Sequence, residues 1–96
     1  MITSGQIRAA RSLIKWTGKE LAEVSGVAFS TLMRLETGEG VPAAQAKTLS
    51  AIQKAFESAG IEFIGTPESG AGVRWKANPS FLWTVYKSSK KELIVL

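Results

Sequence analysis

TGKELAEVSGVAFSTLMRLETG, residues 17–38, has the pattern of two short helices joined by a tight turn. Thr17 and Glu20 have the spacing of a capping box, in which each side chain accepts a hydrogen bond from the other residue's backbone N–H, so a helix is expected to begin there. Gly26 supplies the left-handed conformation that ends a helix at low cost. The next helix is expected over residues 28–37.

Small and apolar residues in this segment stand where a helix-turn-helix needs them. That motif is two short helices that cross steeply around a tight turn, so it requires a small residue where the helices approach and apolar residues that face the core. Ala22 is the small residue. The residues expected to face inward are Leu21, Val27, Leu32 and Leu35.

Two longer helices are expected to flank the motif. Thr3 and Gln6 have the spacing of another capping box and begin the first one. Apolar residues at helical spacing place both helices against a common core. These residues are Ile7, Ala10, Leu13 and Ile14 in the first helix, and Leu49, Ile52 and Phe56 in a helix expected over residues 44–59.

The pattern changes after Gly60. Strands are expected at residues 61–64, 73–76 and 81–86, with turns over 65–72 and an apolar end at 93–96. The predicted fold class is mainly α. It comprises a four- to five-helix domain over residues 1–60, which contains the helix-turn-helix, followed by a β-rich extension over residues 61–96.

The sequence over residues 3–60 resembles the Xre-type, lambda-repressor-like (Cro/CI) family of DNA-binding domains. The stretches that carry the resemblance are Trp16-Thr17, Leu21-Ala22, Ser25-Gly26-Val27 and Leu35-Glu36-x-Gly38, and residues 55–64 resemble a common continuation in short members. The resemblance implies a lambda-repressor-like fold that binds double-stranded DNA, with the helix near 28–37 in the major groove.

Carried onto this chain, the family's base-contacting positions are Ala28, Phe29, Ser30, Met33 and Arg34. Arg34 is the strongest candidate for direct readout, because a guanidinium donates to guanine O6 and N7 together. Ser30 can donate or accept a hydrogen bond, and Met33 is suited to contact with a thymine methyl group. Phe29 is left with two interpretations, the same methyl contact or packing in the core.

The resemblance also implies phosphate contacts at the start of the helix that follows Thr17, where free backbone N–H groups and the helix dipole favour an anion. The expected phosphate contacts are Thr17, Gly18, Lys19, Thr31, Thr37 and Lys47. Three features depart from the family. Gly18 stands where glutamine is frequent, Ala28 lacks the usual capping hydroxyl, and the loop over residues 39–46 holds no cation. We therefore expect modest affinity per subunit and a need for dimerisation.

Arg11 and Glu36 are expected, from the resemblance, to form an ion pair between the first and third helices. Partial burial would make such a pair orient the helices more than stabilise them, because desolvation offsets the attraction between the charges.

The amino-acid composition excludes several classes of functional site. The chain has no cysteine, histidine or aspartate, so the usual zinc ligands and the Ser-His-Asp and Cys-His catalytic systems are missing. We expect no enzyme activity, no cofactor and no metal. The net charge of +4 is compatible with nucleic acid but spreads evenly over the chain. No apolar run has the length of a membrane span and the N-terminus does not resemble a signal peptide, so we expect a cytoplasmic, nucleoid-associated protein.

Three functional hypotheses follow. The leading one is a sequence-specific transcriptional regulator, a repressor that acts as a homodimer on double-stranded DNA. The second is the antitoxin of a toxin–antitoxin pair, which would bind a protein partner through residues 61–96. The third is a protein-interaction module that keeps the fold without binding DNA. The extension over residues 61–96 either forms the dimer interface or packs on its own chain.

Overall fold

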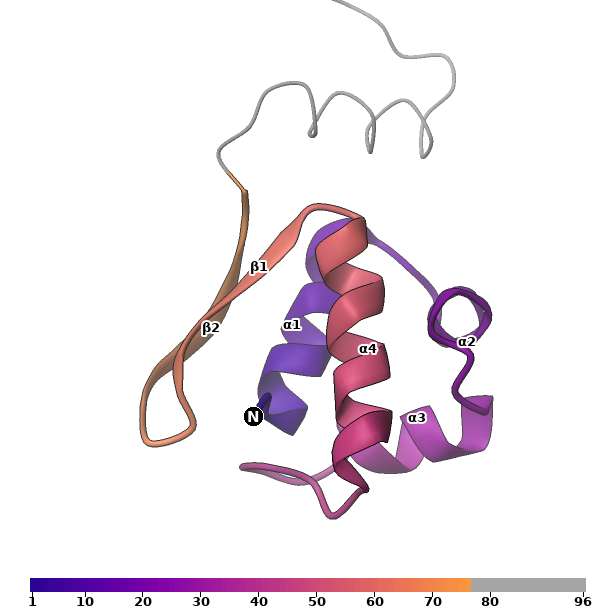
Figure 1. Cartoon of the computed structure of the whole chain (residues 1–96), viewed down its shortest axis with the longest axis horizontal. Helices are drawn as coiled ribbons and strands as arrows, with labels where there is room; N and C mark the ends of the chain where they lie inside the picture. The colour runs from indigo at the N-terminus through magenta and orange to yellow at the C-terminus, as the bar shows by residue number, and fades with distance from the viewer. Residues whose placement is uncertain (77–96) are drawn as a thin grey trace, which may run out of the picture.

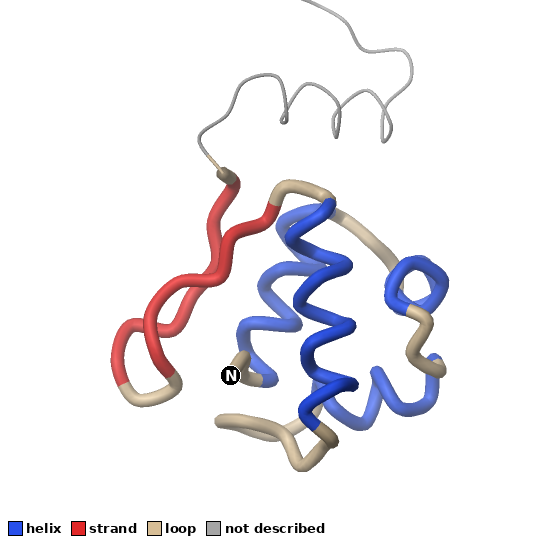
Figure 2. Tube along the Cα trace, viewed as in Figure 1, coloured by secondary structure: helices blue, strands red, loops and turns tan. Residues whose placement is uncertain are grey.

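Four helices and a β-hairpin make up the part of the chain that the computed structural model describes, residues 1–76 (Figures 1 and 2). The mainly α architecture with a β segment after it is therefore confirmed. The strand expected at 81–86 and the apolar end at 93–96 lie outside the described residues. In chain order the elements are α1 (Ser4–Ile14), α2 (Gly18–Ser25), α3 (Phe29–Glu36), α4 (Ala46–Ser58), β1 (Ile61–Thr66) and β2 (Ser69–Trp75).

The helix starts follow from local sequence. Both expected capping boxes are formed: Thr3 and Gln6 at the start of α1, and Thr17 and Glu20 at the start of α2, each satisfy the other's backbone N–H. Gly26 ends α2 in the left-handed conformation, with φ of 77°. By contrast, α3 and α4 begin without a side-chain cap.

The core lies between the four helices and the hairpin. Figure 1 shows α2 and α3 on one side of α4 and the hairpin on the other, and α1 contacts both α3 and the hairpin. Trp16 stacks on Phe56 with ring centroids 5.5 Å apart, and Phe63 of β1 lies 6.0 Å from the same ring. The largest fully buried apolar side chains are Phe56, Ile7, Leu21, Leu32, Leu35, Ile52 and Ile61.

The hairpin is longer than the sequence predicts. The turn expected over residues 65–72 is wrong, because β1 and β2 continue into that range and leave only residues 67–68 as the turn. Gly65 makes this possible: it takes φ of +77° at an irregularity in the antiparallel register, and a Cβ atom there would lie 2.1 Å from the Gly70 carbonyl oxygen.

Gln6 fastens the hairpin to α1. Its Nε2 atom donates to the carbonyl oxygens of Ile64, at 3.1 Å, and Gly72, at 2.8 Å. Its Oε1 atom accepts the capping-box hydrogen bond from the backbone N–H of Thr3. Since β2 contacts α1 and β1 contacts α4, this part of the extension packs on its own chain. None of the helices within residues 1–76 has the length and apolar content needed to cross a bilayer.

Candidate nucleic-acid interface

The α2–α3 unit presents one face to solvent because its other face is held in the core. Leu21, Leu32 and Leu35 are almost completely buried. Gly26 turns the chain between the helices, and the backbone N–H of Val27 donates to the Ser25 hydroxyl at 3.2 Å. With these apolar residues fixed inside, the opposite side of α3 faces outward.

Of the residues expected to read bases, Ala28, Phe29 and Ser30 are exposed at the start of α3, and Arg34 is exposed in its last turn. Met33 differs from the expectation, because it is half-buried and packs against the core. Phe29 fits neither of its two interpretations fully: it is 44% exposed, yet its ring lies against Gly18 at the start of α2.

Arg34 reaches from α3 toward the loop that precedes α4. One guanidinium nitrogen, Nη1, lies 3.4 Å from the carbonyl oxygen of Ala43, a long and exposed contact. That loop holds no cation of its own and one acid, Glu39. The Arg34 guanidinium therefore supplies positive charge beside a loop that lacks it, and its exposure leaves it free to turn toward a ligand.

The expected phosphate contacts come from three separate places. Thr17, Gly18 and Lys19 lie together at the start of α2, where Gly18 is buried and its two neighbours are exposed. Thr31 is half-buried on α3, and Thr37 follows α3 with its hydroxyl donating to the Arg34 carbonyl at 2.8 Å. Lys47 is exposed in the first turn of α4, outside the α2–α3 unit.

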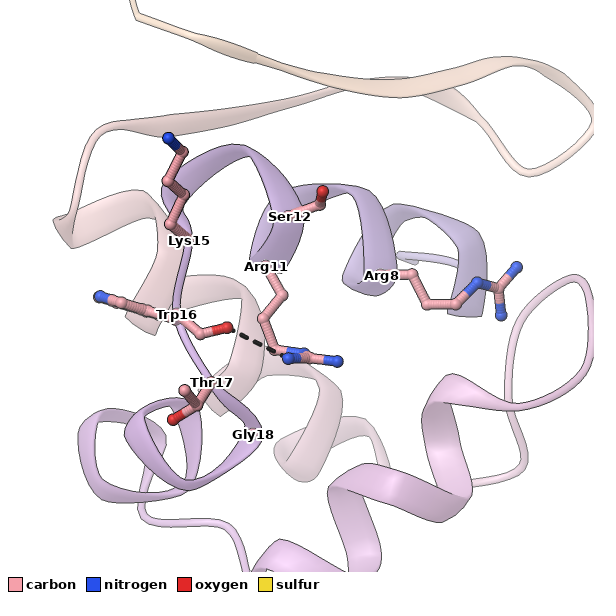
Figure 3. Close-up of a pocket in the computed structure, with 7 residues that line it drawn as sticks. All are labelled: Arg8, Arg11, Ser12, Lys15, Trp16, Thr17 and Gly18. Carbon is pink, nitrogen blue, oxygen red and sulfur yellow. Dashed lines mark hydrogen bonds between the residues drawn. The ribbon is translucent and has the colours of Figure 1, made fainter.

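A basic hollow of about 400 Å³ lies between α1 and the start of α2. Figure 3 shows the Arg11 guanidinium between Arg8, which also lies on α1, and Lys15, which directly follows α1. Sequence reasoning did not assign Arg8, Ser12 or Lys15 to a site, although their helical spacing off the apolar stripe of α1 was a signal. The basic hollow is lined by Arg8, Arg11, Ser12, Lys15, Trp16, Thr17 and Gly18.

The ion pair expected between α1 and α3 is present. Arg11 donates from Nε to Glu36 Oε2 at 2.7 Å and from Nη2 to Glu36 Oε1 at 2.9 Å, a two-pronged geometry that fixes both side chains. This hydrogen bonding raises the pKa of Arg11 above its ordinary value, and the nearby Glu36 charge acts in the same direction. The guanidinium also donates to the Trp16 carbonyl at 3.1 Å, so Arg11 ties α3 to the segment that leads into α2.

Arg8 adds a second tie between α1 and the end of α3. Its Nη1 atom donates to the carbonyl oxygens of Glu36 and, at 3.1 Å, Gly38. Carbonyls at the end of a helix lack partners within the helix, so a cationic donor is favourable there. The two arginines together set how α3 lies against α1.

Neither a scan against models of known protein families nor a search of curated proteins found a match for this sequence. Within residues 1–76, no group of three potential metal-binding side chains converges. The geometry of α2, α3 and the basic hollow is therefore the basis for a functional proposal.

Proposed function

We propose that this protein is a sequence-specific DNA-binding regulator of transcription, with a lambda-repressor-like fold and α3 inserted in the major groove. The observation that carries the proposal is the arrangement of α3. Its Leu32 and Leu35 side chains are buried, whereas Phe29 and Ser30 in its first turn and Arg34 in its last turn are exposed. Phe29 lies against Gly18 at the start of α2, which borders the basic hollow. A helix with a free polar face next to an anion-binding helix start is what major-groove recognition requires.

In this proposal the basic hollow and the start of α2 bind one phosphate group of the DNA backbone. The capping box satisfies the backbone N–H groups of Thr17 and Glu20, so those of Gly18 and Lys19 in the first turn of α2 are the ones that would donate to an anion. Lys19 is exposed beside them, and Arg8 and Lys15 line the basic hollow. Such contacts position the protein on the duplex and carry no sequence information.

Sequence readout is assigned to the exposed side of α3. Ser30 lies in its first turn, and Arg34 lies one turn further on, so the two reach neighbouring base pairs. Arg34 leaves its contact with Ala43 and donates to guanine O6 and N7, which discriminates against other bases by about 1–3 kcal/mol.

We further propose that the protein acts as a homodimer and represses transcription in the cytoplasm, at the nucleoid. Residues 1–60 hold seven Lys or Arg against five Glu, so one subunit has little charge with which to hold DNA. Since phosphate contacts supply much of the affinity, two subunits on two half-sites compensate for this deficit. The candidate dimer contact is the extension over residues 61–96, through surface that its hairpin does not bury against α1 and α4.

The test is a salt titration of binding to duplex DNA of random sequence, followed by fluorescence anisotropy. For a groove-binding protein the logarithm of affinity falls linearly with the logarithm of salt concentration, with a slope of about 0.9 for each phosphate contacted. A clear negative slope supports the proposal. Absence of binding at low salt would overturn it.

A protein-interaction module is the second candidate function. It is favoured by two large apolar residues that are exposed within the α2–α3 unit, Val24 at 50% and Phe29 at 44%. The antitoxin hypothesis combines both activities, with DNA held by the α2–α3 unit and a toxin held by residues 61–96. Co-purification of a stoichiometric protein partner, with or without salt-sensitive DNA binding, separates these alternatives.

A further inference from the structure

Gly18 separates two surfaces of different character at the start of α2. On one side it borders the basic hollow (Figure 3). On the other side, a Cβ atom at position 18 would lie 2.7 Å from Phe29 Cε1 and 2.7 Å from Met33 Cε. Carbon atoms in proteins pack at about 3.5–4.0 Å. The absence of a side chain at position 18 is therefore what lets Phe29 and Met33 close over the first turn of α2.

The Phe29 ring packs against Gly18 on one side and is exposed to solvent on the other. Phe29 is the first residue of α3, and Met33, four residues later on the same side of the helix, packs against the core beneath it. Yet Phe29 remains 44% exposed. Because Gly18 borders both surfaces, this exposed ring stands next to the basic hollow that the proposed function assigns to a phosphate.

The chemistry of this surface selects one group in the major groove. Phe29 and Met33 offer no strong hydrogen-bond donor or acceptor, so a purine or cytosine edge placed against them loses water without gaining a partner. Thymine alone presents an apolar group there, its C5 methyl. That methyl is attached on the side of the base nearest its own sugar and phosphate. A thymine methyl can therefore contact Phe29 while the neighbouring phosphate lies in the basic hollow.

We propose that Phe29, placed by Gly18 and supported from the core side by Met33, recognises a thymine methyl next to the phosphate bound in the basic hollow. Gly18 is the positioning residue, since it permits the apolar contact without touching the base. This inference rests on the proposed DNA-binding function and adds to it the identity of one base in each half-site.

The test replaces thymine by deoxyuridine, which removes the methyl and keeps every hydrogen-bonding group. A duplex is first selected from a random library with the wild-type protein, and each thymine is then replaced in turn. At one position in each half-site, affinity should fall about four-fold, the factor expected for about 0.8 kcal/mol per buried methyl-sized group. The readout is this thymine-to-deoxyuridine affinity ratio, measured within each variant.

Two substitutions should bring the ratio to one. Phe29→Ala removes the ring, and Gly18→Ala places a methyl group where the ring now lies. Val24→Ala is the matched control, because it truncates another exposed apolar side chain, on α2, and should leave the ratio unchanged. Circular dichroism checks that each variant is folded.

Two results would overturn the inference. One is a wild-type protein that selects a site but is insensitive to every methyl; an equal loss of affinity for both duplexes in Phe29→Ala would then indicate contact with the sugar. The other is a Phe29→Ala variant that keeps the wild-type ratio. Both results leave the DNA-binding proposal standing, whereas absence of salt-sensitive binding to any duplex removes the inference and that proposal together.

Discussion

Replacing Glu36 by glutamine keeps the size of an almost fully buried side chain and removes its charge. The glutamine turns an –NH₂ group toward the guanidinium of Arg11, so one of the two hydrogen bonds, now at 2.7 and 2.9 Å, is lost. A hydrogen bond to a charged group contributes about 1.5–3 kcal/mol, and breaking a fully buried pair costs about 3–5 kcal/mol. Because the Arg11 side chain is 29% exposed and regains water, we expect a loss near the lower values, about 2 kcal/mol.

Thermal and urea unfolding, followed by circular dichroism, measure this loss. In a domain of this size about 1 kcal/mol shifts Tm by roughly 4–8 °C, so Glu36→Gln should lower Tm by roughly 8–16 °C. Glu62→Gln is the matched control. It makes the same chemical change in the exposed pair with Arg74 and should leave Tm nearly unchanged, because water already screens that pair. Equal shifts in the two variants would refute the argument from burial.

Five further substitutions test the fold and the interface. Gln6→Glu should cost about 2–3 kcal/mol in urea unfolding, because a buried carboxylate would face the two hairpin carbonyls that Gln6 now donates to. Gly65→Ala should cost about 2 kcal/mol or more, whereas Gly70→Ala, at a similar φ but with open space around it, should cost about 1–2 kcal/mol. Arg34→Ala should weaken binding and relax base preference at one position by about ten-fold, measured against single-base variants of the selected duplex. Lys19→Ala should weaken binding to all sequences about equally and reduce the salt slope by about one.

The helices could be predicted because their signals are local. Thr3 with Gln6, and Thr17 with Glu20, encode helix starts within four residues, and both boxes are formed. The hairpin boundaries were wrong because they depend on distant contacts. Glycines between residues 65 and 72 indicated turns, but the backbone there pairs as strands, fastened to α1 by Gln6.

The candidate site was predictable only in part, for a similar reason. Helical spacing and the family resemblance placed Ser30 and Arg34 on an outer face, and both are exposed. The basic hollow was not predicted, because Arg8 and Lys15 meet the start of α2 only after folding. The half-burial of Met33 depends on the missing side chain of Gly18, a contact between two helices that periodicity within one helix does not report.

The most direct test of the DNA-binding proposal is a backbone-amide NMR titration of the full chain with a short duplex. The result expected is that perturbed amides cluster in the first turn of α2, at Gly18 and Lys19, and along α3 from Phe29 to Arg34. Perturbation confined to the hairpin, or a spectrum unchanged by duplex at low salt, would contradict the assignment of α3 to the major groove.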